Sequence, residues 1–380
     1  MRTLFLIILL LHGSIHMVGV VKAFRPATVS ELSQTISRPL GVLWLFTALL
    51  FFAALTAYYM KAERWPQITI AAVIMSQFLI TLNWGDAKYG TILNFVIIAI
   101  SIPAYGKMEF NNATLKEGSG LFENAEIENL KVHRPADFVS LPPAVQKWIK
   151  RSGSAVTSEI VTLRLKQQGK MRTKPDGSWM PFSAEQYFNV QDPGFVWTTR
   201  VQPMPLIYLH GRDQLKNGQG KMLIKLLSLF KVVDEKSNDR INSGTMIRYL
   251  SEICWFPSAA AKEYLHWEQI GKHTAQATIR VGDQKVSGTF SFSETGDFQS
   301  FEALRYRGGG KDAKQEPWLV EALDYREFNG TRIPSNCRVT WKLPDGDFTW
   351  LHLEITHLEY NVKHPYHSSE TELSPTETYI

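Results

Sequence analysis

The sequence predicts a fold of two parts: a bundle of about four transmembrane helices, then a soluble, mostly antiparallel β domain of the α+β class. Three observations predict it. Four long apolar runs lie within residues 1–106. From about residue 157 the apolar residues recur with a period of two, which is typical of strands. Short glycine-containing turns separate most of these segments, as in a meander of hairpins.

The apolar runs are each about 17–20 residues long, close to the length that an α-helix needs to cross the hydrocarbon of a bilayer. The first run has the basic start of a signal peptide, but it ends in Val-Val-Lys-Ala-Phe without small residues at a cleavage site. We therefore expect a retained helix. Aromatic residues near the run ends, such as Trp84 and Tyr105, are typical of a membrane interface. The runs are residues 4–21, 40–59, 66–82 and 89–105.

Charge separates the two parts of the chain. Residues 1–106 hold seven basic and three acidic side chains, a net charge of +4, and the rest of the chain carries only +1 of the total of +5. This near balance on the soluble part argues against nucleic acid as a partner. Basic residues are densest in the first loop, residues 22–39, which we therefore expect to be cytoplasmic. Four spans then place the soluble domain outside the cytoplasm.

Five polar residues in or beside the membrane runs form a predicted polar cluster: His12, His16, Gln77, Asp86 and Asn94. His12 and His16 are four residues apart and so share one helix face. Polar groups in a membrane are costly and usually face the bundle interior. They fit either interhelical hydrogen bonds that fix the bundle or a metal, haem or proton-relay site. Two histidines without a third ligand are a weak metal signal, so no metal is assigned.

A loosely structured connector is expected at residues 107–137, before a β-rich domain at residues 138–363. The domain opens with a short helix near residues 142–153, because two prolines suit a helix start and a glycine follows as a stop. A helical insertion is expected at residues 244–264, broken by a proline. About ten strands flank it, and one face of such a sheet must be covered. We therefore expect an open half-barrel with the helices in its hollow.

Three shorter segments have patterns of their own. Residues 221–233 fit a strand or a helix. The segment 307–311, Arg-Gly-Gly-Gly-Lys, resembles a phosphate loop, but no helix pattern follows it, so we expect a flexible hairpin loop. The tail at residues 364–380 is rich in Ser, Thr, Glu and His and is expected to be disordered.

The sequence carries no catalytic motif, and we predict no cofactor and favour a protein that is not an enzyme. His352 and Glu354 share one face of the last strand, where they form either an acid–base pair or part of a solvated face. Cys254 and Cys337 form no C-x-x-C motif. They are expected to be buried apolar residues, although an oxidising compartment would let them pair.

Aromatic residues are spread across the soluble domain and suit either a core or an apolar ligand pocket. Glu252, in the helical insertion, is either a functional buried carboxylate or an i, i+4 partner of Arg248. The insertion around Trp255, Phe256 and Pro257 would form a lid or a pocket wall. The candidate ligand-binding residues are Trp197, Tyr208, Glu252, Trp255, Phe256 and Trp267.

The sequence also resembles a family of bacterial membrane proteins that has no assigned activity. In the first part the resemblance rests on ILLLHGSIHMVGVVKAF and WGDAKYGTILN. In the second it rests on LPPAVQKW, GTMIRYLSEICWFPSA, YLHWEQI, DYREFNGTRIPSN and VTWKLPDGDFTW. It covers most of the chain and implies the same architecture, without catalytic residues to carry over. By strand order, the β domain is similar to the LolA/LolB type of lipoprotein carrier, which implies an open half-barrel with helices over an apolar cavity.

These observations favour a membrane-anchored binding protein of the bacterial envelope, with a lipid or a lipoprotein-related group as the apolar ligand. Its predicted partners are the lipid bilayer and that ligand. Two alternatives remain. The first is a metal, haem or redox enzyme that uses His12 and His16 in the membrane bundle. The second is a membrane sensor whose soluble domain signals through the helices.

Overall fold

The computed structural model describes residues 2–366 of the chain, which divide into two compact units with a boundary after Asn111. The first unit is helical. Its elements are α1 (Arg2–Phe24), η1 (Pro26–Thr28), α2 (Arg38–Tyr59), α3 (Trp65–Leu82), the short α4 (Trp84–Ala87) and α5 (Gly90–Phe122), which ends beyond the boundary.

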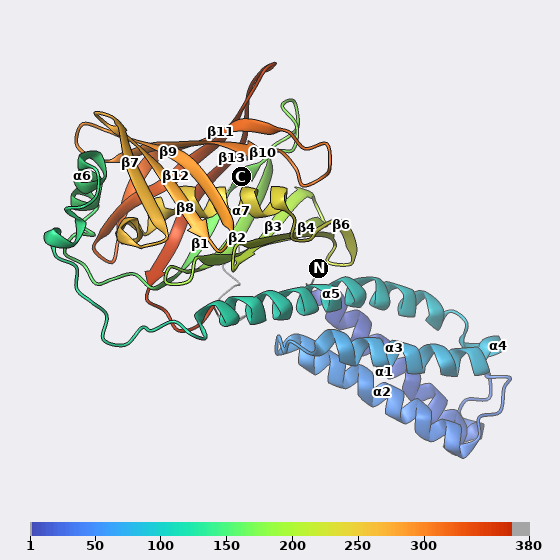
Figure 1. Cartoon of the computed structure of the whole chain (residues 1–380). Coiled ribbons are helices and arrows are strands. Elements are labelled where there is room, and N and C mark those ends of the chain that lie inside the picture. The colour runs from blue at the N-terminus through green and yellow to red at the C-terminus, as the bar shows by residue number, and fades with distance from the viewer. Residues whose placement is uncertain (1, 367–380) are drawn as a thin grey trace. The chain divides into compact units, whose positions relative to one another are not determined.

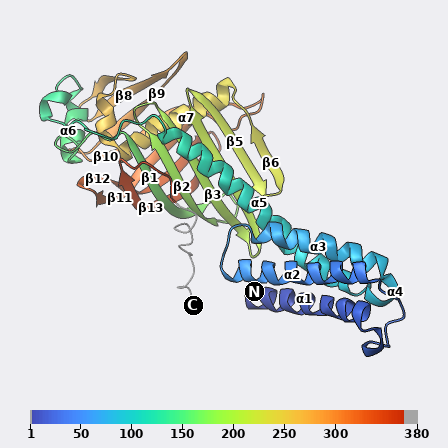
Figure 2. The same ribbon diagram turned by 90° about the horizontal axis from the view of Figure 1, so that it is seen from below.

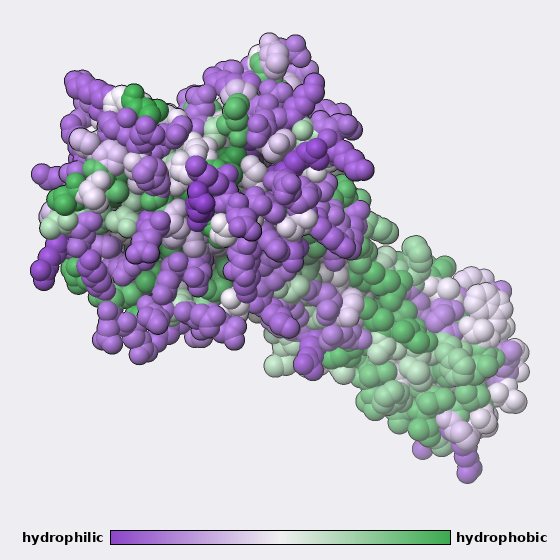
Figure 3. All heavy atoms as spheres, in the orientation of Figure 1, coloured by the Kyte–Doolittle hydropathy of each residue, from purple (hydrophilic) through white to green (hydrophobic). Residues whose placement is uncertain are grey.

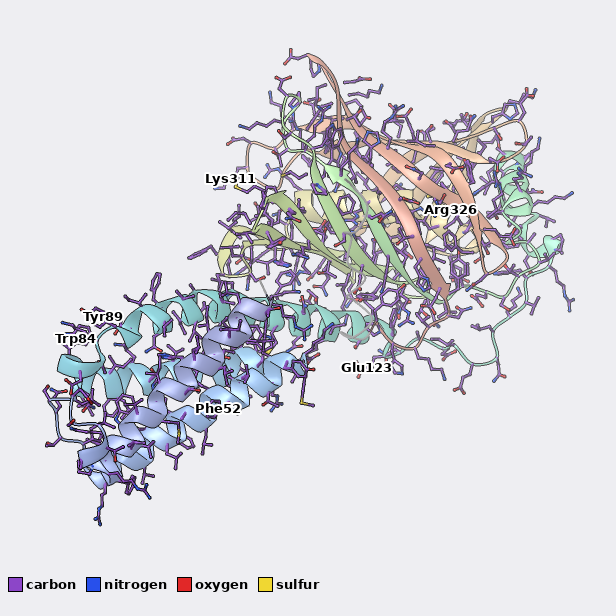
Figure 4. All side chains as sticks on the ribbon, turned by 180° about the vertical axis from the view of Figure 1, so that it is seen from behind. Phe52, Trp84, Tyr89, Glu123, Lys311 and Arg326 are labelled. Atoms are coloured by element: carbon purple, nitrogen blue, oxygen red, sulfur yellow. The ribbon has the colours of Figure 1, made fainter. Side chains whose placement is uncertain are left out.

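Within residues 2–366, four helices are long and apolar enough to cross a membrane, namely α1, α2, α3 and α5. Their apolar windows are only 22–39% buried within the protein. The remaining apolar surface is exposed, and Figure 3 shows it as the green that gathers over these helices. Exposing such an apolar surface to water is energetically unfavourable, whereas lipid chains can cover it without this cost. Trp84 and Tyr89 lie together near the turn between α3 and α5 (Figure 4), where an interfacial aromatic pair is expected.

The expectation of a loosely structured connector is wrong for residues 107–122, because α5 continues through them to Phe122. Mixed charge and two glycines favoured a loop, but mixed charge also suits an exposed helix face. The last turns of α5 have their own anchors in the second unit. Glu117 forms an ion pair with Arg212, and Asn189 Nδ2 donates to Leu121 O at 2.7 Å.

The described part of the second unit is built on one antiparallel sheet of thirteen strands in the order β6-β5-β4-β3-β2-β1-β13-β12-β11-β10-β9-β8-β7. Two meanders, β1 to β6 and β7 to β13, meet where β1 pairs with β13. The strands are β1 (Thr162–Met171), β2 (Met180–Asn189), β3 (Gly194–Met204), β4 (Ile207–Lys216), β5 (Gln219–Leu226), β6 (Phe230–Glu235), β7 (Leu265–Gly271), β8 (Thr274–Val281), β9 (Gln284–Phe292), β10 (Phe298–Tyr306), β11 (Gln315–Phe328), β12 (Thr331–Leu343) and β13 (Gly346–Tyr360).

The sheet stays open, and the chain crosses from its edge at β6 to its edge at β7 through a helical insertion. The insertion comprises α7 (Asp239–Glu252), η3 (Ile253–Trp255) and η4 (Pro257–Ala261). Figures 1 and 2 show the sheet curling around α7, which packs against β4 and β5 on one side and β8, β9 and β10 on the other. This confirms the predicted fold class of membrane-type helices plus an open antiparallel sheet with helices in its hollow.

The strand count corrects two details of the prediction. Strand β7 was missed, because its sequence LHWEQIG follows the helical insertion directly and carries no turn signal before it. Residues 221–233 are not helical but form most of β5 and β6, which join at a turn where Leu227 and Ser228 have positive φ. The segment 307–311 is the predicted loop, between β10 and β11.

Two shorter helices, η2 (Pro135–Phe138) and α6 (Pro143–Arg151), precede the sheet. Helix α6 buries Trp148 and Ile149 and ends before Gly153, whose φ of +82° suits glycine, as the sequence predicted. Of the predicted disordered tail, only residues 364–366 are among the described residues. Tyr366 is buried there, with its ring 4.2 Å from the guanidinium carbon of Arg164. The rest of the tail lies outside the described residues.

Gly220 sets how closely β5 approaches α7. A Cβ at this position would fall inside contact distance of Thr245 Oγ1 and 2.8 Å from Ile241 O. Gly220→Val is therefore expected to push α7 away from the sheet and to lower the free energy of unfolding of the second unit by about 1–3 kcal/mol, as overpacking does. Chemical unfolding of the full chain in detergent, followed by tryptophan fluorescence, measures this change.

Gly310→Ala is the matched control, since nothing lies within 4 Å of a Cβ built there. It is expected to change the free energy of unfolding by less than about 0.5 kcal/mol. Equal effects of the two substitutions would contradict the close fit of α7 against β5.

Candidate functional site

The strand register defines a row of side chains across the concave face of β1 to β5. Direct cross-strand partners point to the same side of a sheet. One continuous set of partners is Leu165, Gln186, Trp197, Asp213 and Met222. Helix α7 packs over this row from inside the hollow (Figure 1). An indole, an amide and a carboxylate are thereby brought together beneath a helix.

Arg248 of α7 is the centre of this arrangement. Its Nη1 donates to Asp213 Oδ2 and its Nε to Glu252 Oε1, both at 2.8 Å. Its guanidinium carbon lies 4.6 Å from the ring centroid of Trp197, in cation–π contact. The i, i+4 pair of Arg248 and Glu252 considered from the sequence is therefore present, and Asp213 adds a second carboxylate 35 residues away.

Two glutamines extend the network along the sheet. Gln186 Nε2 donates to the second oxygen of Glu252, Oε2, at 2.8 Å. Gln167 accepts a hydrogen bond from Trp197 Nε1 at 2.8 Å and donates to Gln186 Oε1 at 3.3 Å. The carboxylate and the indole are thus both held in fixed orientations, which suits a site that must keep one geometry.

A second guanidinium, Arg305 of β10, approaches from the opposite wall. Its Nε donates to Gly244 O of α7 at 3.0 Å, and its guanidinium carbon lies 4.8 Å from the ring of Trp318. Burial and then the nearby charge of Arg248 lower the pKa of Arg305 to about 10. Burial also raises the pKa of Asp213 and of Glu252, while Arg248 acts to lower both. The hollow therefore holds two cations and two carboxyl groups that depend on one another.

An apolar row lies beside the charged network. Its direct cross-strand partners are Phe182, Val201, Leu209, Leu226 and Phe230. Exposure rises along it, from 5% at Phe182 and Val201 to 64% at Phe230, with the two leucines half-buried. Asp213 and Leu209 are four residues apart on β4, about 13 Å at the rise of a strand. We call these five residues the apolar row; it leads from the core to the edge strand.

The predicted ligand-binding residues fall into three places. Trp197 and Glu252 meet at Arg248, as described. Phe256 is fully buried in the aromatic core with Trp255 and Trp267, whose indole N–H groups donate to Pro334 O at 3.1 Å and to Ala260 O at 3.0 Å. Tyr208 neighbours Leu209 on β4 and so points to the other face of the sheet, where its ring lies 3.8 Å from the guanidinium carbon of Arg200.

Sequence reasoning missed Asp213, Arg305 and the apolar row. The signal for Asp213 and Arg305 was the strand period: Asp213 shares the inward positions of Leu209 and Leu215, and Arg305 continues the inward positions of Phe301 and Ala303. A charged residue at an inward position needs a partner. The partner could not be identified from the sequence, because it comes from a distant helix.

In the first unit, the polar cluster forms a hydrogen-bonded network that joins α1, α3 and α5. His12 Nε2 lies 2.8 Å from Asn94 Oδ1 and 3.2 Å from Ser76 Oγ. Asn94 Nδ2 donates to Gln77 Oε1 at 3.0 Å, and His16 Nδ1 lies 2.8 Å from His12 O. Within residues 2–366, no group of three or more His, Cys, Asp or Glu side chains is arranged to hold a metal ion. The contacts correspond to the interhelical hydrogen bonds considered from the sequence.

Asp86 is not brought into this network. It sits in α4 and accepts hydrogen bonds from Gln34 N at 2.9 Å and from Ser33 Oγ at 2.8 Å. The Gln34 N–H and then the Ser33 hydroxyl hold the pKa of Asp86 below its usual value. Lys22 Nζ donates to Val29 O and Leu32 O at 3.0 and 2.7 Å. Asp86 and Lys22 thus fasten the loop between α1 and α2.

His352 and Glu354 each have other partners. Glu354 pairs with Arg326 of β11 at 2.7 Å (Arg326 is labelled in Figure 4) and accepts from Gln168 Nε2 at 2.9 Å. The ring centroid of His352 lies 5.1 Å from that of Trp179, and partial burial lowers its pKa. These contacts suit a solvated strand face. Cys254 and Cys337 are free and buried, and burial raises the pKa of the Cys337 thiol to about 12.

Comparisons with known proteins describe the β domain. Residues 139–360 match the model of a family described as a family of unknown function (DUF6920). No protein with a curated description matches the chain. A LolA superfamily protein from Nitrosomonas europaea has a similar structure, with 8% identity, a TM-score of 0.32 and coverage of 57% of this chain and 93% of that one. A putative outer membrane lipoprotein-sorting protein domain from Vibrio parahaemolyticus has 10% identity, a TM-score of 0.32 and coverage of 57% and 90%. These likenesses concern the fold alone.

The Arg248 network makes a prediction about pH. Arg248→Met removes the charge that stabilises the ionised forms of Asp213 and Glu252, whose pKa values burial already raises. When the pKa of a carboxyl group is higher in the folded state than in the unfolded state, its ionisation destabilises the folded state. This destabilisation is complete above the folded-state pKa and is absent below the unfolded-state pKa. The variant should therefore lose about 3–5 kcal/mol of unfolding free energy at pH 8 and much less at pH 4.5. Unfolding of the full chain at both pH values measures this.

Lys231→Met is the control, because it breaks the Lys231–Asp234 pair, whose side chains are 61% and 40% exposed. Exposed pairs contribute about 0–1 kcal/mol. A deficit of Arg248→Met that stayed constant from pH 4.5 to pH 8 would contradict the assigned coupling.

The network in the bundle makes a second prediction. Asn94→Leu leaves His12 and Gln77 without the partners that Asn94 supplies and should lower the unfolding free energy of the bundle by about 0.6–1.7 kcal/mol. Unfolding in mixed micelles, followed by helicity, measures it. Phe95→Leu, at a neighbouring position that is 72% exposed, is expected to have little effect. No difference between the two variants would argue against a stabilising network.

Proposed function

Because the chain belongs to the family of unknown function DUF6920, its function has to be inferred from its own geometry, and we propose a membrane-anchored binding protein. In this proposal the β domain holds a lipid or a similar amphiphile on the concave side of β2 to β6. The observation that carries the proposal is the apolar row, which runs from the buried core to an exposed edge beside the Arg248 network.

The apolar row suits an acyl chain. Helix α7 covers the neighbouring row around Asp213, while Leu209 and Leu226 are only half-buried and Phe230 is exposed. Apolar surface removed from water contributes roughly 25 cal/mol per Å². A chain lying along this row would therefore gain binding energy from side chains that the protein itself leaves partly uncovered.

The charged network suits the polar end of the same ligand. Ligand sites are usually apolar with a few convergent polar groups. Asp213, which pairs with Arg248, lies about 13 Å from Leu209 along β4, a separation that one lipid-sized molecule can span. Arg248 is already paired with two carboxylates, so its charge needs no counter-ion from a ligand. A polar head group would instead form additional hydrogen bonds with this network.

Four helices that are able to span a membrane would anchor this domain. The basic loop at residues 22–39 favours the cytoplasmic side for itself and hence the outer side for the β domain. The proposed protein therefore binds its amphiphile within the cell envelope, close to a bilayer that contains such molecules.

Photo-crosslinking of the full chain in nanodiscs tests the proposal. The nanodiscs contain phosphatidylcholine and a small fraction of a phospholipid with a diazirine on its acyl chain. After irradiation, mass spectrometry should find crosslinks on peptides of β3 to β5, besides those on the membrane helices. Leu209→Glu should reduce the β-domain crosslinks several-fold, because a carboxylate in the apolar row repels an acyl chain.

Leu304→Glu is the matched control, since Leu304 is 58% exposed and alternates with the inward-facing Ala303 and Arg305 on β10. It should leave the crosslinks unchanged. Crosslinks confined to residues 2–111 in the unsubstituted chain would overturn the proposed binding site.

A further inference from the structure

Two neighbouring hairpin tips at one end of the sheet expose large apolar side chains. The first tip joins β3 to β4 and the second joins β5 to β6. They adjoin each other, since Leu227 N donates to Tyr208 O at 2.8 Å and Ser228 Oγ lies 2.9 Å from His210 Nδ1. Exposure is 58% at Met204, 63% at Leu206, 64% at Phe230 and 60% at Val232. We call these four residues the apolar tips.

The backbone of these turns is unusual for the residues that occupy it. Leu206 has φ of +66°, Leu227 of +51° and Ser228 of +60°. The left-handed region is sterically unfavourable for bulky side chains, and hairpin turns normally place Asn or Gly there. The same domain does so between β4 and β5, where Asn217 and Gly218 have φ of +52° and +74°. Leucine is thus present in the two tips although its backbone conformation there is unfavourable. We infer that the apolar side chain has a role that offsets this conformational cost.

A row of basic residues lies beside the apolar tips, on the face of the sheet opposite the apolar row. Its direct cross-strand partners are Arg200, His210, Lys225 and Lys231. His210 is buried against Ser228, so the cations of this row are Arg200, Lys225 and Lys231. Lys225 and Lys231 are direct cross-strand partners, and like charges in such positions repel each other. Lys231 also forms an exposed ion pair with Asp234. A surface that carries negative charge would attract these cations.

We propose that the two hairpin tips dock on the interface of an anionic bilayer. Met204, Leu206 and Phe230 insert among the lipid chains, and the basic row contacts the anionic head groups. Exposed apolar side chains flanked by basic ones are the chemistry of interfacial membrane binding. The bilayer is also the surface at hand, because the same chain carries four helices able to span it. Phe230 belongs both to the tips and to the end of the apolar row, whereas Met204, Leu206 and Val232 lie outside that row, so the inference goes beyond the proposed ligand binding.

The test uses the full chain in vesicles of phosphatidylcholine and phosphatidylglycerol. Met204→Cys is labelled with an environment-sensitive fluorophore, and spin-labelled phospholipids in the vesicle act as quenchers. Asn217→Cys, at the opposite end of β4, is the matched control. The unsubstituted chain, treated in parallel, corrects for labelling of the buried Cys254 and Cys337. Docking predicts a blue-shifted emission and several-fold stronger quenching at position 204 than at 217.

A second variant separates docking from folding. Leu206→Asn combined with Leu227→Asn supplies residues that suit positive φ and keeps the contact of Ser228 with His210, so the unfolding temperature should stay the same or rise. Lipid quenching at position 204 should fall at least by half. Replacing phosphatidylglycerol by phosphatidylcholine should also weaken it, because the basic row then loses its counter-charge.

Three results would overturn the inference. The first is equal quenching at positions 204 and 217. The second is unchanged quenching in the double variant. The third is a blue shift without lipid quenching that grows with protein density in the vesicle, which would assign the tips to a second copy of the chain. None of these depends on crosslinking of a ligand to the concave face, so the proposed function and this inference fail separately.

Discussion

The pairing of Arg248 with Asp213 and Glu252 is the interaction on which the arrangement of the β domain depends. The chain leaves one edge of the sheet at β6 and returns at the other edge as β7, so α7 must cross the hollow. Apolar packing alone would fit a helix there in more than one register. Ion pairs are directional, and Arg248 joins α7 to β4 at a defined position. A buried ion pair is weak evidence for net stability, but it can specify one arrangement among several.

The same interaction explains why the hollow is divided. On one side of Arg248, α7 and η3 bring Tyr249, Trp255 and Phe256 into a dense aromatic core. On the other side the apolar row passes Leu209 and Leu226 towards the edge with decreasing cover. If α7 lay closer to the floor of the hollow, it would bury the apolar row. If α7 lay farther from the floor, it would expose the aromatic core. The position fixed by Arg248 thus produces both the packed region and the partly uncovered surface.

Local patterns allowed much of the fold to be predicted from the sequence, and long-range contacts account for most of what was missed. Strand β8, Thr274–Val281, is one of the strands that period-two alternation predicts, because the alternation there is regular and a Gly-containing turn follows. Strand β7 was missed, since η4 runs into it almost without a break. The pair of Arg248 and Glu252 follows from i, i+4 spacing, whereas Asp213 could not be assigned to Arg248 without the fold. The same limit applies in the bundle, where 82 residues separate His12 from its partner Asn94.

The strand period connects the two surfaces of β3 to β6. Neighbouring residues on a strand point to opposite faces, so Val201 and Leu209 lie in the apolar row while Arg200 and His210 lie in the basic row. Both rows reach the end of the sheet where Leu206 and Leu227 occupy strained turns. Few residues of a folded protein occupy a local conformation that their residue type disfavours, and such residues concentrate at functional surfaces. Apolar residues in strained turns, a basic row beside them and an apolar row on the concave face all meet at this end. The proposed lipid contact at this end of the sheet would account for the three features together.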